Sequence, residues 1–141
     1  MRKLFSIMLV GTFLMSLLTI SASAAYSVTE DFDVYINGGS VVSSKMAEKA
    51  LSTKLPMWAW VEKQEGSTVK WLPSEYVNIR GRSPSNKYAT YVEQVNSEHV
   101  GQIKLGYLDG YGQMGSFYRM AVQYDNDNPY THLELTVTWS P

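Results

Sequence analysis

The chain has 141 residues and a mass of 15.9 kDa, with 12 basic side chains, 13 acidic side chains and no cysteine. This length allows one domain with one hydrophobic core and excludes a multidomain protein. The absence of cysteine excludes a disulfide-stapled scaffold and thiol chemistry. The near balance of charge provides no general attraction to nucleic acid, so we expect no nucleic-acid partner.

Residues 1–24 have the features of a secretory signal peptide. Two basic residues precede an apolar stretch over residues 4–20, and small residues follow it. This order is typical of a cleaved leader. We expect cleavage after Ala24, with Ala25 as the second choice, and export of residues 25–141 as one domain with no transmembrane anchor. The alternative is an uncleaved anchor, because about 17 mostly apolar residues nearly span a thin bilayer.

Residues that favour strands dominate the rest of the chain. Aromatic side chains stand among Val, Ile, Thr and Leu in short runs that alternate with polar residues. The alternation is clearest over residues 32–36, 117–124 and 133–139. Each of these runs predicts a strand with one buried face.

Turn residues between the runs predict two hairpins. One joins residues 57–63 to residues 68–72 through a four-residue loop, and the other joins residues 88–95 to residues 102–107. Residues 44–52 are ambiguous, because their composition favours a short helix while a strand before Pro56 competes. About seven strands at this spacing predict an all-β fold, either an antiparallel β-sandwich or a flattened barrel.

Two motifs match known binding loops only in part. Gly110–Gly115 has the spacing of a dinucleotide loop, but a strand pattern follows it where a helix is needed, so we interpret it as a glycine-rich hairpin loop. Asp125–Asn128 begins like a calcium loop but lacks its later Gly and Glu, which favours a plain turn over a weak calcium site. His99 and His132 have no partner at metal-ligand spacing, so no metal or cofactor is expected.

Carboxylates offer the one enzymatic alternative. Two acids on neighbouring strands can flank a glycosidic bond, and Glu62, Glu93, Glu98 and Glu134 lie on predicted strands or at their ends. Acids on a small sheet protein usually form a solvated face. We therefore expect a protein that is not an enzyme and has no catalytic residue.

Aromatic residues are the candidate ligand-binding surface. Trp58 and Trp60 lie two apart and share one side of a strand, and Trp71 is expected on the partner strand near them. An outward row of such rings suits stacking on sugars, whereas an inward row would form the core. If the row points inward, five tyrosines become the better candidates for a recognition surface, namely Tyr76, Tyr88, Tyr91, Tyr107 and Tyr111.

Three basic residues in one loop region form a further candidate. Arg80, Arg82 and Lys87 could meet anionic wall polymers or lipid headgroups, although a solvated loop is the default explanation.

Four short features in order resemble a family of small, uncharacterised secreted proteins of Gram-positive bacteria, sometimes encoded beside bacteriocin-type exporter permeases. They are Pro56-Met57-Trp58, Glu65-Gly66-Ser67, Leu105-Gly106-Tyr107 and the ending Val137-Thr138-Trp139-Ser140-Pro141. The resemblance spans most of residues 28–141. It implies a non-enzymatic role in antimicrobial competition or envelope stress, and it carries no catalytic residue over to this chain.

The leading hypothesis is therefore a secreted binding protein that acts at the bacterial cell envelope, with a wall polymer or another envelope protein as its partner. A bacteriocin-like antimicrobial effector is the alternative. A processed chain would carry ten basic and thirteen acidic residues, a formal charge of −3, which does not suit a membrane-active cation. A wall-active glycosidase ranks third.

Overall fold

A computed structural model describes residues 27–35, 38–125 and 132–141 of the chain. The described residues contain nine strands and no helix. None of these segments includes a helix with the length and apolarity to cross a bilayer. The predicted signal peptide and its cleavage residues Ala24 and Ala25 lie outside the described residues.

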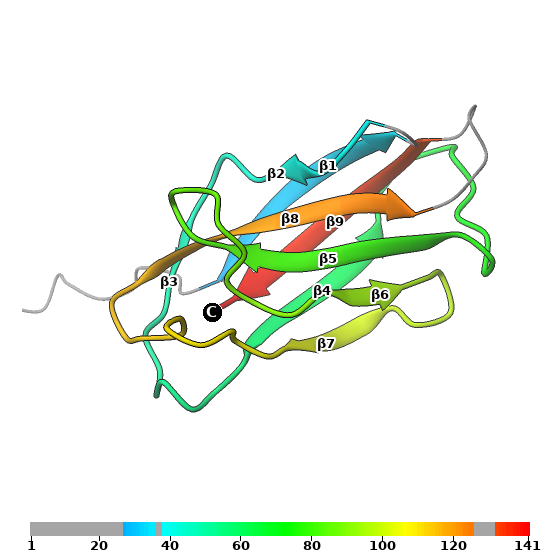
Figure 1. Ribbon diagram of the computed structural model, residues 1–141. Coiled ribbons are helices and arrows are strands. Elements are labelled where there is room, and N and C mark those ends of the chain that lie inside the picture. The colour runs from blue at the N-terminus through cyan, green and yellow to red at the C-terminus, as the bar shows by residue number, and fades with distance from the viewer. Residues whose placement is uncertain (1–26, 36–37, 126–131) are drawn as a thin grey trace, which may run out of the picture.

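Two antiparallel sheets pack together as a β-sandwich (Figure 1), which confirms the first of the two predicted all-β architectures. The first sheet has the order β1 (Val28–Tyr35), β9 (His132–Ser140), β4 (Met57–Lys63) and β7 (Gly101–Leu105). The second sheet has the order β2 (Val41–Val42), β8 (Phe117–Asp125), β5 (Tyr76–Arg82) and β6 (Glu93–Val95), and β3 (Ala47–Glu48) also pairs with β8.

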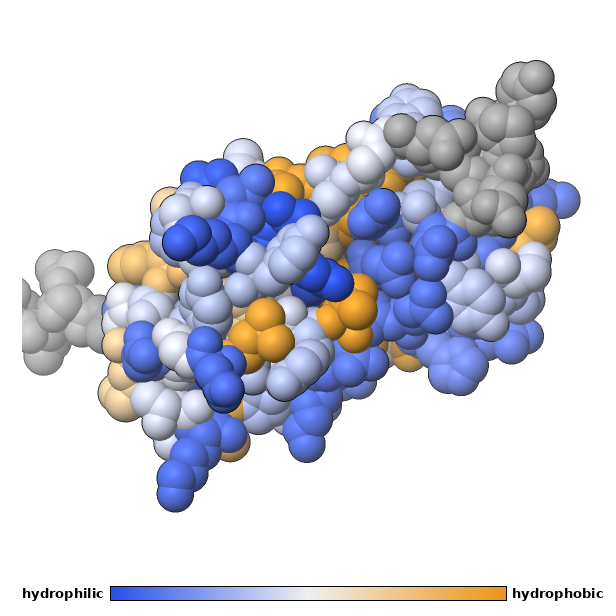
Figure 2. All heavy atoms as spheres, viewed as in Figure 1, coloured by the Kyte–Doolittle hydropathy of each residue, from blue (hydrophilic) through white to orange (hydrophobic). Residues whose placement is uncertain are grey.

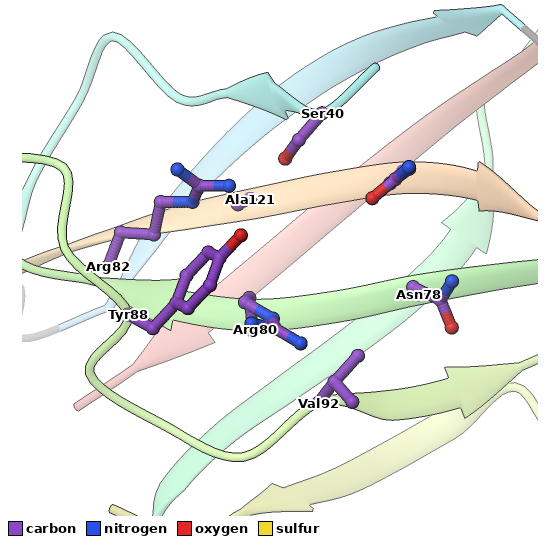
Figure 3. Close-up of a pocket in the computed structure, with 8 residues that line it drawn as sticks. Ser40, Asn78, Arg80, Arg82, Tyr88, Val92 and Ala121 are labelled. Carbon is purple, nitrogen blue, oxygen red and sulfur yellow. The ribbon is translucent and has the colours of Figure 1, made fainter. Parts of the chain in front are cut away.

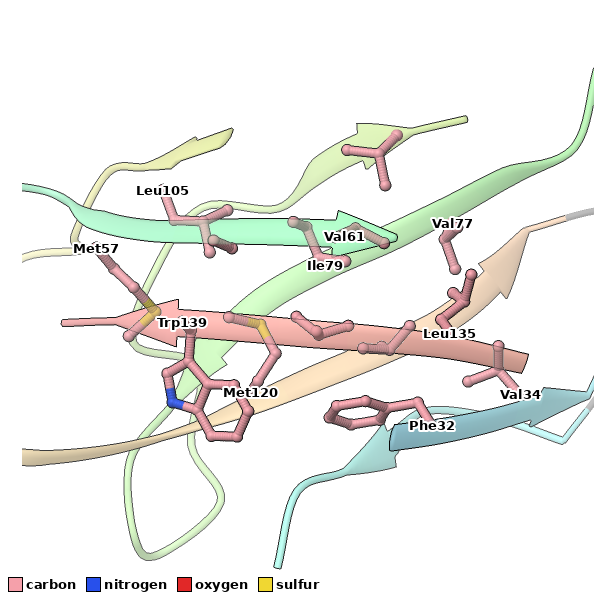
Figure 4. Packing of buried hydrophobic residues seen from close by; sticks show 14 of the residues in the cluster. Phe32, Val34, Met57, Val61, Val77, Ile79, Leu105, Met120, Leu135 and Trp139 are labelled. Atoms are coloured by element: carbon pink, nitrogen blue, oxygen red, sulfur yellow. The ribbon is translucent and has the colours of Figure 1, made fainter. Parts of the chain in front are cut away.

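The hydrophobic core lies between the sheets and follows the alternation of the strands. Every second residue of β9 is buried, and β4, β5 and β8 repeat this pattern over most of their length. Figure 4 shows inward side chains from both layers meeting around β9. Trp139 is fully buried, and its ring centroid lies 6.5 Å from that of Phe32 in an edge-to-face arrangement. The three clearest alternating runs of the sequence therefore do form strands.

The first predicted hairpin is wrong, and the second forms only in part. Residues 68–72 form no strand, and β4 pairs with β7 on one side and with β9 on the other. Residues 88–95 and 102–107 do meet at one antiparallel bridge, between Thr90 and Tyr107. Their strands nevertheless belong to different sheets, because β6 pairs with β5 whereas β7 pairs with β4. Alternation identifies strands and buried faces, but it does not select the partner strand when distant segments supply more core contact.

The short helix considered for residues 44–52 is also wrong, because this segment contains β3 instead. Lys49 of this segment is fully buried, and its Nζ donates a hydrogen bond to the carbonyl of Leu55 at 2.9 Å. The backbone of Lys49 pairs with residues 115 and 116, which precede β8. These long-range hydrogen bonds outweigh the local helix propensity.

A substitution of Leu135 tests whether the inward face of β9 forms the centre of the core. The Leu135 side chain is fully buried between the sheets, so Leu135→Ala is expected to lower the free energy of unfolding by about 2–5 kcal/mol. Urea denaturation measures this change. Gln102→Ala, on the exposed side of β7, is the control and should change stability by less than about 0.5 kcal/mol. Equal effects of the two changes would contradict this packing.

Lys49 provides a test that depends on pH. Burial lowers the pKa of Lys49 below its ordinary value of 10.5. Between the lowered pKa and 10.5 the unfolded chain holds more protons at this position than the folded chain, so this lysine's contribution to stability becomes more favourable as pH rises. We expect Lys49→Met to remove that rise and to be at least as stable as the wild type at pH 7. Urea denaturation at several pH values checks this, and a less stable Lys49→Met protein at pH 7 would contradict it.

Candidate functional site

Trp58 and Trp60 lie on the outward face of the first sheet. In β4 the residues Met57, Ala59 and Val61 are fully buried, so the two tryptophans between them point away from the core and are half-buried. Because a strand rises about 3.3 Å per residue, their attachment points lie about 7 Å apart along it. Of the two orientations that the sequence left open, the structure has the outward one.

A shallow hollow of about 300 Å³ lies beside Trp60. Glu62 of β4 and Thr136 and Thr138 of β9 line it, together with Ser27. The strand register brings these residues together, since Trp60 is opposite Thr138 and Glu62 is opposite Thr136. The hollow therefore combines one aromatic ring with hydroxyl and carboxylate groups.

Hydrogen bonds hold the polar side of this hollow in place. The Thr136 hydroxyl donates to Asp31 Oδ1 at 2.7 Å, and the Thr29 and Thr138 hydroxyls share a hydrogen bond of 2.7 Å. Both bonds join β1 to β9 on the outward face. An aromatic surface beside fixed hydroxyl and carboxylate groups can hold a ligand that has apolar ring faces and many hydroxyl groups.

The other predicted aromatic residues do not join this face. Trp71 is buried, with 8% of its surface exposed, and its Nε1 donates to the carbonyl of Glu75 at 2.9 Å. Tyr107 and Tyr111 are partly buried and pack against the core. The Tyr107 hydroxyl is buried without a hydrogen-bond partner in the described part of the chain, and burial raises its pKa. Of the three tryptophans predicted to lie near one another, the structure brings only Trp58 and Trp60 together on an outward surface.

Thr136 and Thr138 are members of the site that the sequence analysis did not select. Their signal was present in the alternation of residues 133–139, because residues between buried Leu, Val and Trp must face outward. The pairing of β9 with β4 was the missing information, since it places these threonines beside Trp60 and Glu62.

Among the candidate carboxylates, the fold brings Glu62 and Glu134 to the same outward face. They lie on neighbouring strands in diagonal positions, which separates such residues by about 7–8 Å. Glu93 belongs to β6 in the second sheet, and Glu98 lies in the turn after it. A hydrogen bond from Ser67 lowers the pKa of Glu134, with a further contribution from His132, and a lowered pKa is opposite to what a general acid needs.

The described residues contain no group of three or more His, Asp or Glu side chains arranged to hold a metal ion. His99 lies in a turn, where its Nδ1 forms a hydrogen bond of 2.8 Å with Asn96 Oδ1. His132 stacks on Tyr35 with a centroid distance of 5.1 Å. In the considered calcium run Asp125–Asn128, residues after Asp125 lie outside the described residues.

The glycine motif at residues 110–115 is a loop before β8, as the sequence predicted. No helix follows it, and Gly110, Gly112 and Gly115 all have positive φ. A Cβ on Gly112 would lie 2.7 Å from the Tyr107 ring, so glycine is required there for close packing as well as for the turn.

Searches against protein-family models, curated proteins and solved structures find no match to this chain. The resemblance noted in the sequence therefore stays a prediction.

Ser67 allows a test of the electrostatics on this face. Because its hydrogen bond is the largest cause of the low pKa of Glu134, Ser67→Ala is expected to raise that pKa toward its ordinary 4.5. The stability that the low pKa provides is present above the unfolded value and is lost as pH falls through the lowered value. Carbon-13 NMR titration of the Glu134 carboxyl group measures the change, with Ser52→Ala as control. An unchanged titration in Ser67→Ala would contradict this assignment.

Proposed function

We propose that this chain is a secreted, non-enzymatic binding protein that acts at the bacterial cell envelope. Its ligand is a wall polymer that contains sugars, and the outward face of the first sheet makes the contact. The observation that carries this proposal is the outward orientation of Trp58 and Trp60, of which Trp60 lines the hollow formed with β9. The secreted location rests on the leader sequence alone.

The chemistry of the hollow supports a sugar over a purely apolar ligand. An indole ring offers a flat apolar surface to the ring face of a sugar. The hydroxyls of Thr136 and Thr138 and the carboxylate of Glu62 lie beside it and can hydrogen-bond to sugar hydroxyls. These strands belong to a packed sandwich, so the surface is rigid and loses little conformational entropy on binding.

Sedimentation with isolated Gram-positive cell walls tests the proposal. We expect the purified protein to pellet with walls, to resist moderate salt and to be released by soluble wall polysaccharide. Trp58→Ala and Trp60→Ala should each weaken binding by about tenfold, which corresponds to roughly 1.4 kcal/mol. Phe117→Ala removes an aromatic ring with 46% exposure from β8 of the second sheet and should bind like the wild type.

The outcomes separate the competing functions. Equal loss of binding in Phe117→Ala and Trp60→Ala would contradict recognition through this face. Failure to bind walls, combined with loss of viability in sensitive cells, would favour the bacteriocin-like effector. Wall hydrolysis that disappears in Glu62→Gln would favour the glycosidase. Thermal unfolding of each variant confirms that the fold persists.

A further inference from the structure

A second hollow, of about 150 Å³, opens on the outward face of the second sheet. Because the two sheets pack by their inner faces, it lies on the opposite side of the sandwich from Trp58 and Trp60. Ala121 of β8 lines the hollow and is 1% exposed, and its small side chain leaves space opposite Arg80 of β5. Figure 2, viewed as in Figure 1, shows strongly hydrophilic residues gathered on the surface over β5 and β8.

Two arginines line this hollow, and a third is the neighbour of one of them on the adjacent strand. Arg80 and Arg82 lie two apart on β5 and line it, and Arg119 of β8 is directly opposite Arg82 in the register. Like charges in opposite positions destabilise a strand pair. Within the described residues none of the three forms a salt bridge, and Glu48, which pairs with Phe117 near Arg119, supplies none. The cluster therefore carries positive charge that the described part of the chain leaves uncompensated.

Two guanidinium nitrogens add independent evidence. The Nε atoms of Arg82 and Arg119 are buried and have no hydrogen-bond partner among the described residues. Buried donors without partners are rare in folded proteins, and each requires an explanation. An anion bound by the outer nitrogens of the same guanidinium groups would compensate the charge that makes this burial unfavourable.

Tyr88 holds the arginines in a fixed arrangement. Its ring lies between them in Figure 3, with the Arg80 guanidinium carbon 4.1 Å and the Arg82 guanidinium carbon 4.8 Å from the ring centroid. Arg82 also donates from Nη1 to the carbonyl and the side-chain oxygen of Asn86, at 3.2 and 3.1 Å. The two side chains are therefore ordered before a ligand arrives, which reduces the entropic cost of binding.

The rest of the lining contains no carboxylate. Asn78 and Gln123 face each other across β5 and β8 and extend the hollow along the strands, and Ser40 adds a hydroxyl. These groups are neutral hydrogen-bonding partners. They suit a hydrophilic chain that continues beyond a charged group, whereas a lipid bilayer offers no such chain.

We propose that this hollow binds a phosphate group of a phosphodiester polymer. The planar fork of arginine matches phosphate oxygens with two hydrogen bonds, and paired guanidinium groups are suited to this anion. The volume of about 150 Å³ has room for one phosphate group, and the polymer continues past Asn78 and Gln123. This site is separate from the proposed sugar-contacting face, so either one can fail without the other.

Nitrogen-15 NMR of the purified protein tests the site directly. We expect sodium phosphate, at constant ionic strength against chloride, to shift the Nε–H signals of Arg82 and Arg119 until they saturate. Poly(glycerol phosphate) should produce the same shifts at a phosphate concentration about tenfold lower or less, because neighbouring groups raise the effective concentration. Vesicles of phosphatidylglycerol should not produce them.

Matched variants distinguish a specific phosphate-binding site from nonspecific attraction to positive charge. Arg80→Gln and Ala121→Val should each weaken phosphate binding about fivefold or more, the first by removing a donor and the second by filling the hollow with every charge kept. Lys54→Gln removes one exposed positive charge from a loop and should bind within twofold of the wild type. Arg119→Gln should be at least as stable as the wild type without phosphate, because it relieves repulsion with Arg82.

Three results would overturn the proposal. The first is the absence of a saturable shift with phosphate, and the second is equal weakening by Lys54→Gln and Arg80→Gln. The third is binding to phosphatidylglycerol vesicles without binding to the soluble polymer, which would assign the cluster to a membrane surface instead. Wall binding through Trp58 and Trp60 is measured separately and is unaffected by any of these results.

Discussion

Burial of the inward face of β9 is the interaction on which the rest of the sandwich depends. The strand lies inside the first sheet, where it pairs with β1 on one side and with β4 on the other. Its four inward side chains, Leu133, Leu135, Val137 and Trp139, are all nearly or fully buried against the second sheet. The chain lacks cysteine, so no disulfide supplements this packing. The pairing of β9 with β1 joins segments about a hundred residues apart in the sequence, and such long-range pairing is typical of all-β folds.

The same constraint produces the candidate site. Because side chains alternate along a strand, burying one face of β9 and β4 forces Thr136, Thr138, Trp58 and Trp60 to the other face. A shift of one residue in the register would place Trp58 and Trp60 in the core and Val61 in solvent. The hydrophobic core therefore determines which groups are offered to a ligand, and the hydrogen bond from Thr136 to Asp31 extends that order to β1.

The sequence predicted well those features that depend on local alternation. The strands around residues 32–36, 117–124 and 133–139 and the sandwich class follow from period two, as does the orientation of each side chain relative to its neighbours. Prediction from the sequence failed where the choice of partner strand determines the structure. The hairpin at residues 57–72 looked favourable locally, yet β4 gains more buried contact from β9 and β7.

The two other misinterpretations have the same origin. The composition of residues 44–52 favours a helix, but the backbone of Lys49 pairs with the loop before β8 and its side chain is buried. Trp71 was expected beside Trp58 because both were placed in one hairpin, but it packs against the core from a segment without strand structure. The second hollow could be predicted only in part. Arg80 and Arg82 are close together in the sequence, whereas Arg119 is brought beside Arg82 only by the register of β8.

The fold thus offers two outward surfaces of different chemistry, one aromatic and hydroxyl-rich and the other basic. The four tryptophans report on the first of them, because Trp58 and Trp60 are outward and half-buried whereas Trp71 and Trp139 are buried. Intrinsic tryptophan fluorescence during titration with soluble wall polysaccharide is therefore the most direct measurement. Our account predicts a saturable blue shift with protection from acrylamide quenching, lost in the Trp58→Phe, Trp60→Phe double variant. Saturable polysaccharide binding with no change in emission would contradict it.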